Sequence, residues 1–501
     1  MLDRYLEKNI QNKLELFNIL HSKTSATMND VLSFLPLSID SIHTLVNELN
    51  FDLVGLAEIK KQTPYFTIVF HGEVTVMELL HAIYQSSNVL HCLKFLILNE
   101  ENHSLTSFIE EQYLTKSSAY RIRERCGEYL QAIGLSLKSN QIVGEEYRIR
   151  FLIALLHYKF GIDCYELSDN DLHITREFIC FTNSAIDQTY TEVTSNEYGF
   201  FEYLFILLWK RKKFATAPIV SKQLDDCKKI FIYEKLKTAL KEFEPNLQMT
   251  LSEYDYDYIY LVYCTTNSCL FANQWTQKDI DYVHEIVFSD PVFYDLLQRI
   301  EKKLGKEIAD SHALRSSLIY FYKKCLLELQ CIIPNKNFYL DSKKSHLTQV
   351  VFEAVAKSIE DWRKKYHRKY TIDNGHIFYL TLQLELIIKQ FLKPVPVFVL
   401  SELGTELEIT TLYLKRLFPS QRITVHPFYI GTRSKDYICS QKRCVVVVNR
   451  KFKYLIEKWN LSEYNTVIPV TVELNTQELI EIQKAIMYYE TGNFLDFINQ
   501  I

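Results

Sequence analysis

The most regular pattern of apolar and polar positions in the amino-terminal third of the chain lies between Ser104 and Gly144. A short helix (SLTSFIEEQYL) is followed by a longer one, and then by an alternating stretch with a polar turn (LSLKSNQIVG) that is typical of a β-wing. Apolar residues in the longer helix recur every three or four positions and predict one buried stripe: Ala119, Ile122, Cys126, Tyr129 and Ile133.

The opposite side of this longer helix carries hydroxyl groups, an aromatic ring and cations near its start. Ser and Thr reach phosphates or base edges, Arg can form two hydrogen bonds with guanine, and Lys neutralises phosphate. An ordinary amphipathic helix with a solvated basic face is the competing interpretation. The predicted DNA contacts are Lys116, Ser117, Ser118, Tyr120, Arg121 and Arg125, with support from Lys138 in the wing.

A similar arrangement is predicted upstream, with helices over 13–21, 27–35 and 39–50 and a strand–turn–strand wing over 53–70. The third helix is expected to turn Ile39 and the apolar residues after it inward, and to expose Ser41, His43 and Thr44 as candidate DNA contacts. Because its outward face is only weakly basic, we expect this unit to be the lesser DNA contact. Two winged units in tandem favour DNA binding over the plain amphipathic interpretation.

The rest of the chain changes character twice. Helical patterns follow one another up to about Leu392, including single helices predicted over 224–243 and 312–330. After Pro394, continuous apolar strands alternate with helices, which predicts a small parallel α/β sheet covered on both faces. The expected fold is mainly α and multidomain: winged helix-turn-helix units at 1–72 and 73–150, helical bundles at 151–280 and 281–392, and an α/β domain at 393–501.

Charge and composition refine this interpretation. With 48% hydrophobic and 24% charged residues, the 501-residue chain has the composition of a folded protein. A net charge of −4 does not exclude nucleic-acid binding, because affinity depends on a local patch of charge. Between Thr115 and Arg125 the sequence contains four basic residues and only one glutamate. The basic run from Lys210 to Lys213 ends a helix, where cations complement the helix dipole, and we interpret it as structural.

Missing motifs exclude other function classes. The eleven cysteines form no CxxC pair and lack histidines at ligand spacing, so we expect reduced thiols, no metal and a cytoplasmic location. No P-loop, GxGxxG, nucleophile elbow or HExxH occurs, so neither an enzyme nor a cofactor is expected. A charged start and a longest apolar run of only FFEYLFILLW predict no signal peptide and no membrane span.

The run KSNQIVGEEYRIRFLIALLHYKFGI (Lys138 to Ile162), preceded by LTKSSAYRIRE (Leu114 to Glu124), closely resembles the RofA-like proteins among the Mga-type virulence regulators. The resemblance implies a transcription regulator of virulence and surface-adhesin genes that binds promoter DNA and self-associates as a dimer. It implies two helical domains similar to the PRD domains through which the sugar phosphotransferase system regulates transcription, and a carboxy-terminal domain similar to a phosphotransferase IIB component. Phosphotransfer proteins and RNA polymerase are the further partners that it implies.

Regulatory domains of this type can receive a phosphoryl group on histidine, which adds a dianionic group at a packed interface. The first candidate is His376, which precedes an amphipathic run, and the second is His312 at a helix start. The competing interpretation of either residue is a capping or surface histidine.

The carboxy-terminal domain departs from a working IIB component, which carries a nucleophilic cysteine directly after its first strand. Here the strand ends in Ser401-Glu402-Leu403-Gly404, and a serine hydroxyl does not readily form the anion that makes cysteine a phosphoacceptor. We therefore expect a folding or dimerisation role, with a IIB-type phosphocarrier as the alternative function. An RNA-binding antiterminator is disfavoured, because such proteins begin with a small β-rich module and this chain begins with helix-turn-helix patterns.

Overall fold

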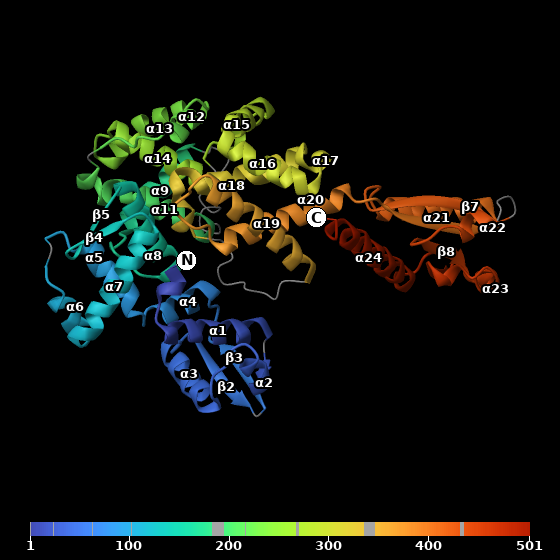
Figure 1. The fold of residues 1–501 in the computed structure, drawn as a ribbon, viewed down its shortest axis with the longest axis horizontal. Coiled ribbons are helices and arrows are strands. Elements are labelled where there is room, and N and C mark those ends of the chain that lie inside the picture. Colours follow the sequence, from blue (N-terminus) through green and yellow to red (C-terminus); the bar gives the residue numbers. More distant parts are fainter. Residues whose placement is uncertain are drawn as a thin grey trace. The chain divides into compact units, whose positions relative to one another are not determined.

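The computed structural model of the chain describes residues 2–23, 25–62, 64–101, 103–182, 195–215, 217–266, 270–334, 346–430 and 435–500. The chain divides into two compact units (Figure 1). The larger unit comprises residues 1–294, 318–343 and 362–377, and the smaller one comprises 295–317, 344–361 and 378–501. The expected fold, mainly α and multidomain with a small carboxy-terminal sheet, is confirmed.

The upstream winged unit forms as predicted, with one additional strand. Its helices are α1 (Lys8–Lys23), α2 (Met28–Leu32) and α3 (Ile39–Asp52), and its strands are β1 (Ser25–Thr27), β2 (Ala57–Gln62) and β3 (Tyr65–Phe70). The antiparallel sheet has the order β1-β3-β2, so the unpredicted β1 pairs with the outer edge of the wing. Contrary to its expected inward position, Ile39 is 53% exposed, because it is the first residue of α3 after the N-cap Ser38.

The downstream winged unit also has the predicted order of elements. Its helices are α4 (Val76–Tyr84), α5 (Asn88–Leu98), α6 (Thr106–Glu111) and α7 (Lys116–Ala132), and its wing is the antiparallel pair β4 (Ser136–Lys138) and β5 (Gln141–Val143). The predicted stripe of α7 is buried apart from the half-buried Ile122, and Cys126 Sγ lies 3.6 Å from the carbonyl of Val89 in α5. One face of α7 is therefore fully used by the core.

The helical region of the larger unit begins with α8 (Glu146–Phe160), which is buried along most of its length. It continues through α9 (Asp169–Thr182), α11 (Ser195–Lys210), α12 (Lys222–Cys227), α13 (Ile232–Leu247), α14 (Glu253–Thr265) and α15 (Gln277–Ser289). The single helix predicted over 224–243 is wrong: it is divided into α12 and α13. The amide of Ile230 bonds to the carbonyl of Cys227 (3.0 Å) in a tighter turn that ends α12, and Tyr260 Oη donates to the same carbonyl (2.5 Å).

The next helices are α16 (Pro291–Leu304), α17 (Lys306–Ala309), α18 (His312–Cys325), α19 (His346–Lys365) and α20 (Asn374–Phe391). The helix predicted over 312–330 is wrong at its end: regular α structure stops at Cys325, and Leu327 and Glu328 follow with left-handed backbones.

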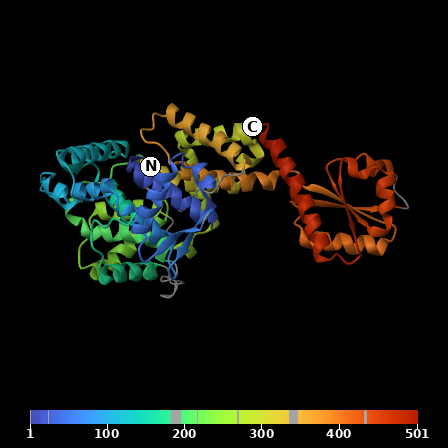
Figure 2. The same cartoon turned by 90° about the horizontal axis from the view of Figure 1, so that it is seen from below.

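The carboxy-terminal part of the smaller unit is the predicted parallel sheet. Its elements are β6 (Val395–Ser401), α21 (Gly404–Leu417), β7 (Ile423–Tyr429), α22 (Lys435–Cys439), β8 (Val445–Asn449), α23 (Lys453–Lys458), β9 (Thr466–Val470) and α24 (Thr476–Ile498). The strands are all parallel in the order β7-β6-β8-β9. Successive residues of β6 and β8 point into separate apolar clusters on the two faces, and helices flank the sheet (Figure 2).

No helix in the described ranges is both long enough and apolar enough to cross a membrane.

One buried carboxylate fixes the start of α24. Glu478 accepts hydrogen bonds from the amides of Asn475 (3.0 Å) and Thr471 (2.9 Å), and from Arg450 Nη2 (2.8 Å). Burial opposes its ionisation, but these hydrogen bonds outweigh burial and hold the pKa of Glu478 below its ordinary value.

We expect Glu478→Gln to lower the free energy of unfolding of the α/β domain by about 1–3 kcal/mol at pH 7, because the amide loses charge-assisted hydrogen bonds. A carboxyl with a depressed folded-state pKa contributes stability above its unfolded pKa of about 4.3 and loses it as the pH falls. Native-state hydrogen exchange of the β8 and β9 amides should therefore show a lower stability of the variant than of the parent. This difference in stability should shrink between pH 7 and pH 3. The exposed Glu481 of the same helix is the control, and a difference that does not change with pH would contradict this account.

Candidate nucleic-acid interface

A capped helix start presents the first turns of α7 to solvent. Thr115 is the N-cap: its Oγ1 accepts a hydrogen bond from the Ser118 amide (3.2 Å) and donates to Ser118 Oγ (2.9 Å). Such a cap satisfies an unpaired amide and fixes where the helix begins. The residues exposed beyond it are Lys116, Ser117, Tyr120, Arg121 and Arg125, while Ser118 is half-buried.

No carboxylate in the described part of the chain pairs with the cations on this edge. Within the described residues, Lys116, Arg121, Arg125 and the wing residue Lys138 take part in no ion pair. Arg121 Nε donates to the carbonyl of Ser117 (3.4 Å) one turn earlier, which holds the side chain along its own helix. The edge therefore keeps its positive charge available for a polyanion.

Arg123, a cation of the same helix, has a structural role. Its Nε donates to Asn140 Oδ1 (2.8 Å), and its Nη2 donates to the carbonyl of Ser139. Ser139 and Asn140 form the turn between β4 and β5, and Asn140 Nδ2 also donates to the carbonyl of His103 (3.0 Å). Arg123 thus fixes the wing against α7, and Lys138 lies at the exposed end of β4 next to this turn.

The sequence patterns missed one exposed aromatic residue at the interface. Tyr113 lies in the turn between α6 and α7 with a left-handed backbone (φ 50°), and 96% of its surface is exposed. Tyr120 in the second turn of α7 is 61% exposed. The only available signal was the place of Tyr113 between two predicted helices, since periodicity gives no information about a turn residue.

The candidate contacts of the upstream unit are engaged locally. Ser41 Oγ lies 2.7 Å from the N-cap Ser38 Oγ, and Thr44 Oγ1 donates to the carbonyl of Asp40 (3.0 Å). His43 Nε2 lies 3.2 Å from Lys61 Nζ in the wing. Both Ser41 and Thr44 are exposed, His43 is half-buried, and the face has few cations of its own.

The basic run from Lys210 to Lys213 is neutralised residue by residue. The pairs are Lys210–Asp171, Arg211–Glu146, Lys212–Asp255 and Lys213–Glu100. Asp171, Glu146 and Asp255 are almost fully buried, so releasing their cations to phosphate would leave buried carboxylates unpaired, which supports the structural interpretation of these three pairs. The Lys213–Glu100 pair is exposed and adds little.

The two candidate histidines differ in accessibility. His376 is 2% exposed: Lys324 Nζ lies 3.2 Å from its Nδ1, and its Nε2 donates to the carbonyl of Ile333 (3.2 Å). Burial, and then the neighbouring Lys324 ammonium, lower the pKa of His376 to about 3. His312 is exposed at the start of α18, with Ser316 Oγ 3.4 Å from its Nδ1. In this conformation, accessibility favours His312, the reverse of the expected order.

The turn after β6 contains a buried hydroxyl bonded on both sides. Ser401 Oγ donates to Glu406 Oε2 (3.0 Å) and accepts a hydrogen bond from the Leu403 amide (3.1 Å). The hydroxyl at the end of β6 therefore acts as a turn cap.

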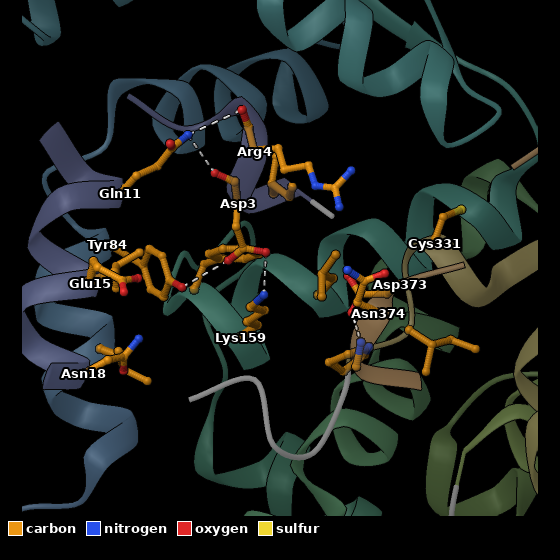
Figure 3. Close-up of a pocket in the computed structure, with 18 of the residues that line it drawn as sticks. Asp3, Arg4, Gln11, Glu15, Asn18, Tyr84, Lys159, Cys331, Asp373 and Asn374 are labelled. Atoms are coloured by element: carbon orange, nitrogen blue, oxygen red, sulfur yellow. Dashed lines mark hydrogen bonds and ion pairs between the residues drawn. The ribbon is translucent and has the colours of Figure 1, made fainter. Parts of the chain in front are cut away.

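A cavity of about 410 Å³ lies beside the amino-terminal segment of the larger unit (Figure 3). Lys159 Nζ donates to Asp3 Oδ2 (2.7 Å), and Tyr84 Oη donates to Asp3 Oδ1 (3.2 Å). Burial opposes ionisation of Asp3, but the Lys159 ammonium holds the pKa of this carboxyl well below its ordinary value. These bonds join the amino terminus to α4 and α8, so we interpret them as structural. No His, Cys, Asp or Glu cluster in the described part of the chain could hold a metal ion.

Together, the winged helix-turn-helix units and the helical region define a DNA-binding transcription regulator. The family model described as the Mga helix-turn-helix domain matches residues 72–157, and that described as the M protein trans-acting positive regulator (MGA) PRD domain matches residues 171–386. The chain belongs to the Mga family of regulators, as the resemblance predicted. No curated protein matches the chain.

Proposed function

We propose that this chain is a cytoplasmic regulator of the RofA-like type that reads promoter DNA through the start of α7. The observation that carries this proposal is the cationic edge of Lys116, Arg121 and Arg125, which no described carboxylate pairs with, beside a rigidly held wing. In this reading the winged units at 1–72 and 73–150 bind DNA, the helical domains at 151–280 and 281–392 regulate binding, and the domain at 393–501 associates. Virulence and surface-adhesin genes are the proposed targets, with RNA polymerase as a further partner.

The chemistry of the edge fits a major groove. Arg121 can pair with guanine, whereas Lys116 at the helix start and Lys138 at the wing suit phosphates on either side of the groove. Ser117 and Ser118 lie in the first turn, where helix amides and short hydroxyls contact phosphate. In the upstream unit, Ser41, His43 and Thr44 are the proposed secondary contacts.

Self-association is proposed through α21. One side of this helix packs on the sheet through Thr410 and Leu414, while its other side exposes Ile409 (50%), Leu412 (59%) and Tyr413 (46%). Glu408 lies one turn before Leu412, and Arg416 lies one turn after it. A second copy packed antiparallel about Leu412 would place each Glu408 opposite the partner helix's basic end, so the surface is complementary to itself.

Regulation by the sugar phosphotransferase system is proposed at a helical-domain histidine. The exposure of His312 supports it over His376, whose two ring nitrogens are both engaged. A phosphorylated imidazole would add a dianion at the start of α18. The IIB-type phosphocarrier alternative is weakened by the bonded hydroxyl of Ser401.

For DNA binding, Arg121→Ala should cost about 1–3 kcal/mol on promoter DNA, and Lys116→Ala should lower the salt slope of binding by about one. Fluorescence anisotropy across a salt series measures both quantities. Lys484→Ala is the matched control: it removes an exposed lysine of α24, outside both winged units, and should leave the salt slope unchanged. Parent-like binding by both Arg121→Ala and Lys116→Ala would remove α7 as the reader.

For self-association, Leu412→Glu should convert the dimer to monomer, because two carboxylates would meet near the symmetry axis. Sedimentation equilibrium of the full chain reports the mass. Val220→Glu, at a position that is 91% exposed outside α21, should leave the mass unchanged. A Leu412→Glu protein that stays dimeric excludes this helix face.

For phosphorylation, incubation with the general phosphotransfer proteins and labelled phosphoenolpyruvate should place acid-labile label on the parent and not on His312→Ala. His376→Ala should keep the label if that side chain is structural. Label retained by His312→Ala and found on residues 393–501 would instead favour the phosphocarrier alternative.

A further inference from the structure

Arg148, in the first turn of α8, is a buried cation held by backbone carbonyls. It is 5% exposed and forms no ion pair within the described residues. Its Nη1 donates to the carbonyls of Ile133 (2.9 Å) and Glu328 (3.2 Å), and its Nη2 donates to the carbonyl of Leu327 (2.7 Å). These three acceptors come from two segments that lie far apart in the sequence and close together in the larger unit.

The first acceptor belongs to the end of the DNA-reading helix. Ile133 is the C-cap of α7, and its carbonyl is one of those that a helix leaves unpaired at its end. The next residue, Gly134, has a left-handed backbone (φ 80°), and a Cβ there would collide with Tyr370 Oη. The Tyr370 ring centroid lies 5.1 Å from the Arg148 guanidinium carbon. The end of α7 is thus enclosed by Arg148 and Tyr370.

The other two acceptors belong to a strained segment after α18. Leu327 (φ 50°) and Glu328 (φ 56°) both have left-handed backbones, which residues other than glycine adopt reluctantly. Their carbonyls point to one guanidinium, and the same segment is held further on by His376 Nε2, which donates to the carbonyl of Ile333 (3.2 Å). This conformation therefore depends on contacts from elsewhere in the fold.

We propose that Arg148 is a positioning residue for DNA binding, which couples the backbone conformation of residues 327–328 to the placement of α7. The planar guanidinium can satisfy all three carbonyls only while both segments keep this arrangement. If the segment relaxed, a buried N–H of Arg148 would lose its partner, and the end of α7 would lose a fixed neighbour. The proposal rests on the function proposed for α7.

The test is a double-mutant cycle on promoter affinity. Arg148→Gln should lower affinity about tenfold, the effect of losing one charge-assisted buried hydrogen bond. Glu328→Pro should also lower affinity, because proline cannot adopt the positive φ of this segment. The double variant should bind no more weakly than Arg148→Gln alone. Glu328→Gly is the matched control: it removes the same carboxylate, permits the left-handed backbone, and should bind within about twofold of the parent.

Hydrogen exchange of the DNA-free protein provides a second readout. The amides of Ile133, Gly134 and Leu135 bond back into the last turn of α7, and they should exchange about tenfold faster in Arg148→Gln and Glu328→Pro but not in Glu328→Gly. If Arg148→Gln does not fold, Arg148→Lys replaces it, because lysine keeps the charge and loses the planar fork.

Additive losses of affinity, parent-like binding by Glu328→Pro, or unchanged exchange at 133–135 would each overturn the proposal. Failure of the underlying function is distinguishable. In that case Arg121→Ala binds promoter DNA like the parent, and the exchange changes persist without any change in affinity.

Discussion

The carboxylate of Glu146 pairs with two buried guanidiniums and thereby fixes α8, the helix that leads from the wing into the helical region. Its Oε1 accepts from Arg150 Nε (3.0 Å) and Arg211 Nε (2.7 Å), and its Oε2 accepts from Arg211 Nη2 (2.8 Å). Arg150 is fully buried, and its guanidinium lies 4.4 Å from the Tyr258 ring centroid. Loss of Glu146 would leave two buried cations without an anion, which is far more costly than loss of a surface ion pair. The helices around α8 can therefore pack only in an arrangement that keeps this carboxylate in place.

Pairing within the fold likewise decides which cations remain available to bind DNA. Arg211 and its lysine neighbours form ion pairs with carboxylates of the protein, although their run of charge is denser than that of α7. Arg123 donates its hydrogen bonds to amide and carbonyl oxygens of the wing. Arg121 and Arg125 lie on the same helix as Arg123, and no described carboxylate pairs with them. In the function proposed for α7, the local availability of cations, rather than their number, lets a chain of net negative charge bind DNA.

Elements governed by local periodicity could be predicted from the sequence. The stripe of α7 and the apolar strands of the parallel sheet were predicted because a single repeat determines which face is buried. The errors occur where a distant side chain bonds to the backbone. Tyr260 donates a hydrogen bond to the carbonyl of Cys227, where one predicted helix divides. Arg148 donates to the carbonyls of Leu327 and Glu328, where a second helix was expected to continue. The burial of His376 and the exposure of Tyr113 likewise depend on tertiary neighbours, which a single sequence does not display.

The turn after β6 in the carboxy-terminal domain already uses, within the fold, the groups that a phosphate-binding loop would need. A phosphate cradle needs free amides and a nucleophile that can accept a phosphoryl group. Here the Leu403 amide bonds to Ser401 Oγ, and the hydroxyl itself donates to Glu406, whose carboxylate would repel an incoming phosphate. Lys451 offsets that charge only in part, since its Nζ lies 3.6 Å from Glu406 and 3.3 Å from Glu402. The local chemistry of this turn thus opposes phosphoryl transfer, which supports the proposal that the domain acts through the surface of its helices.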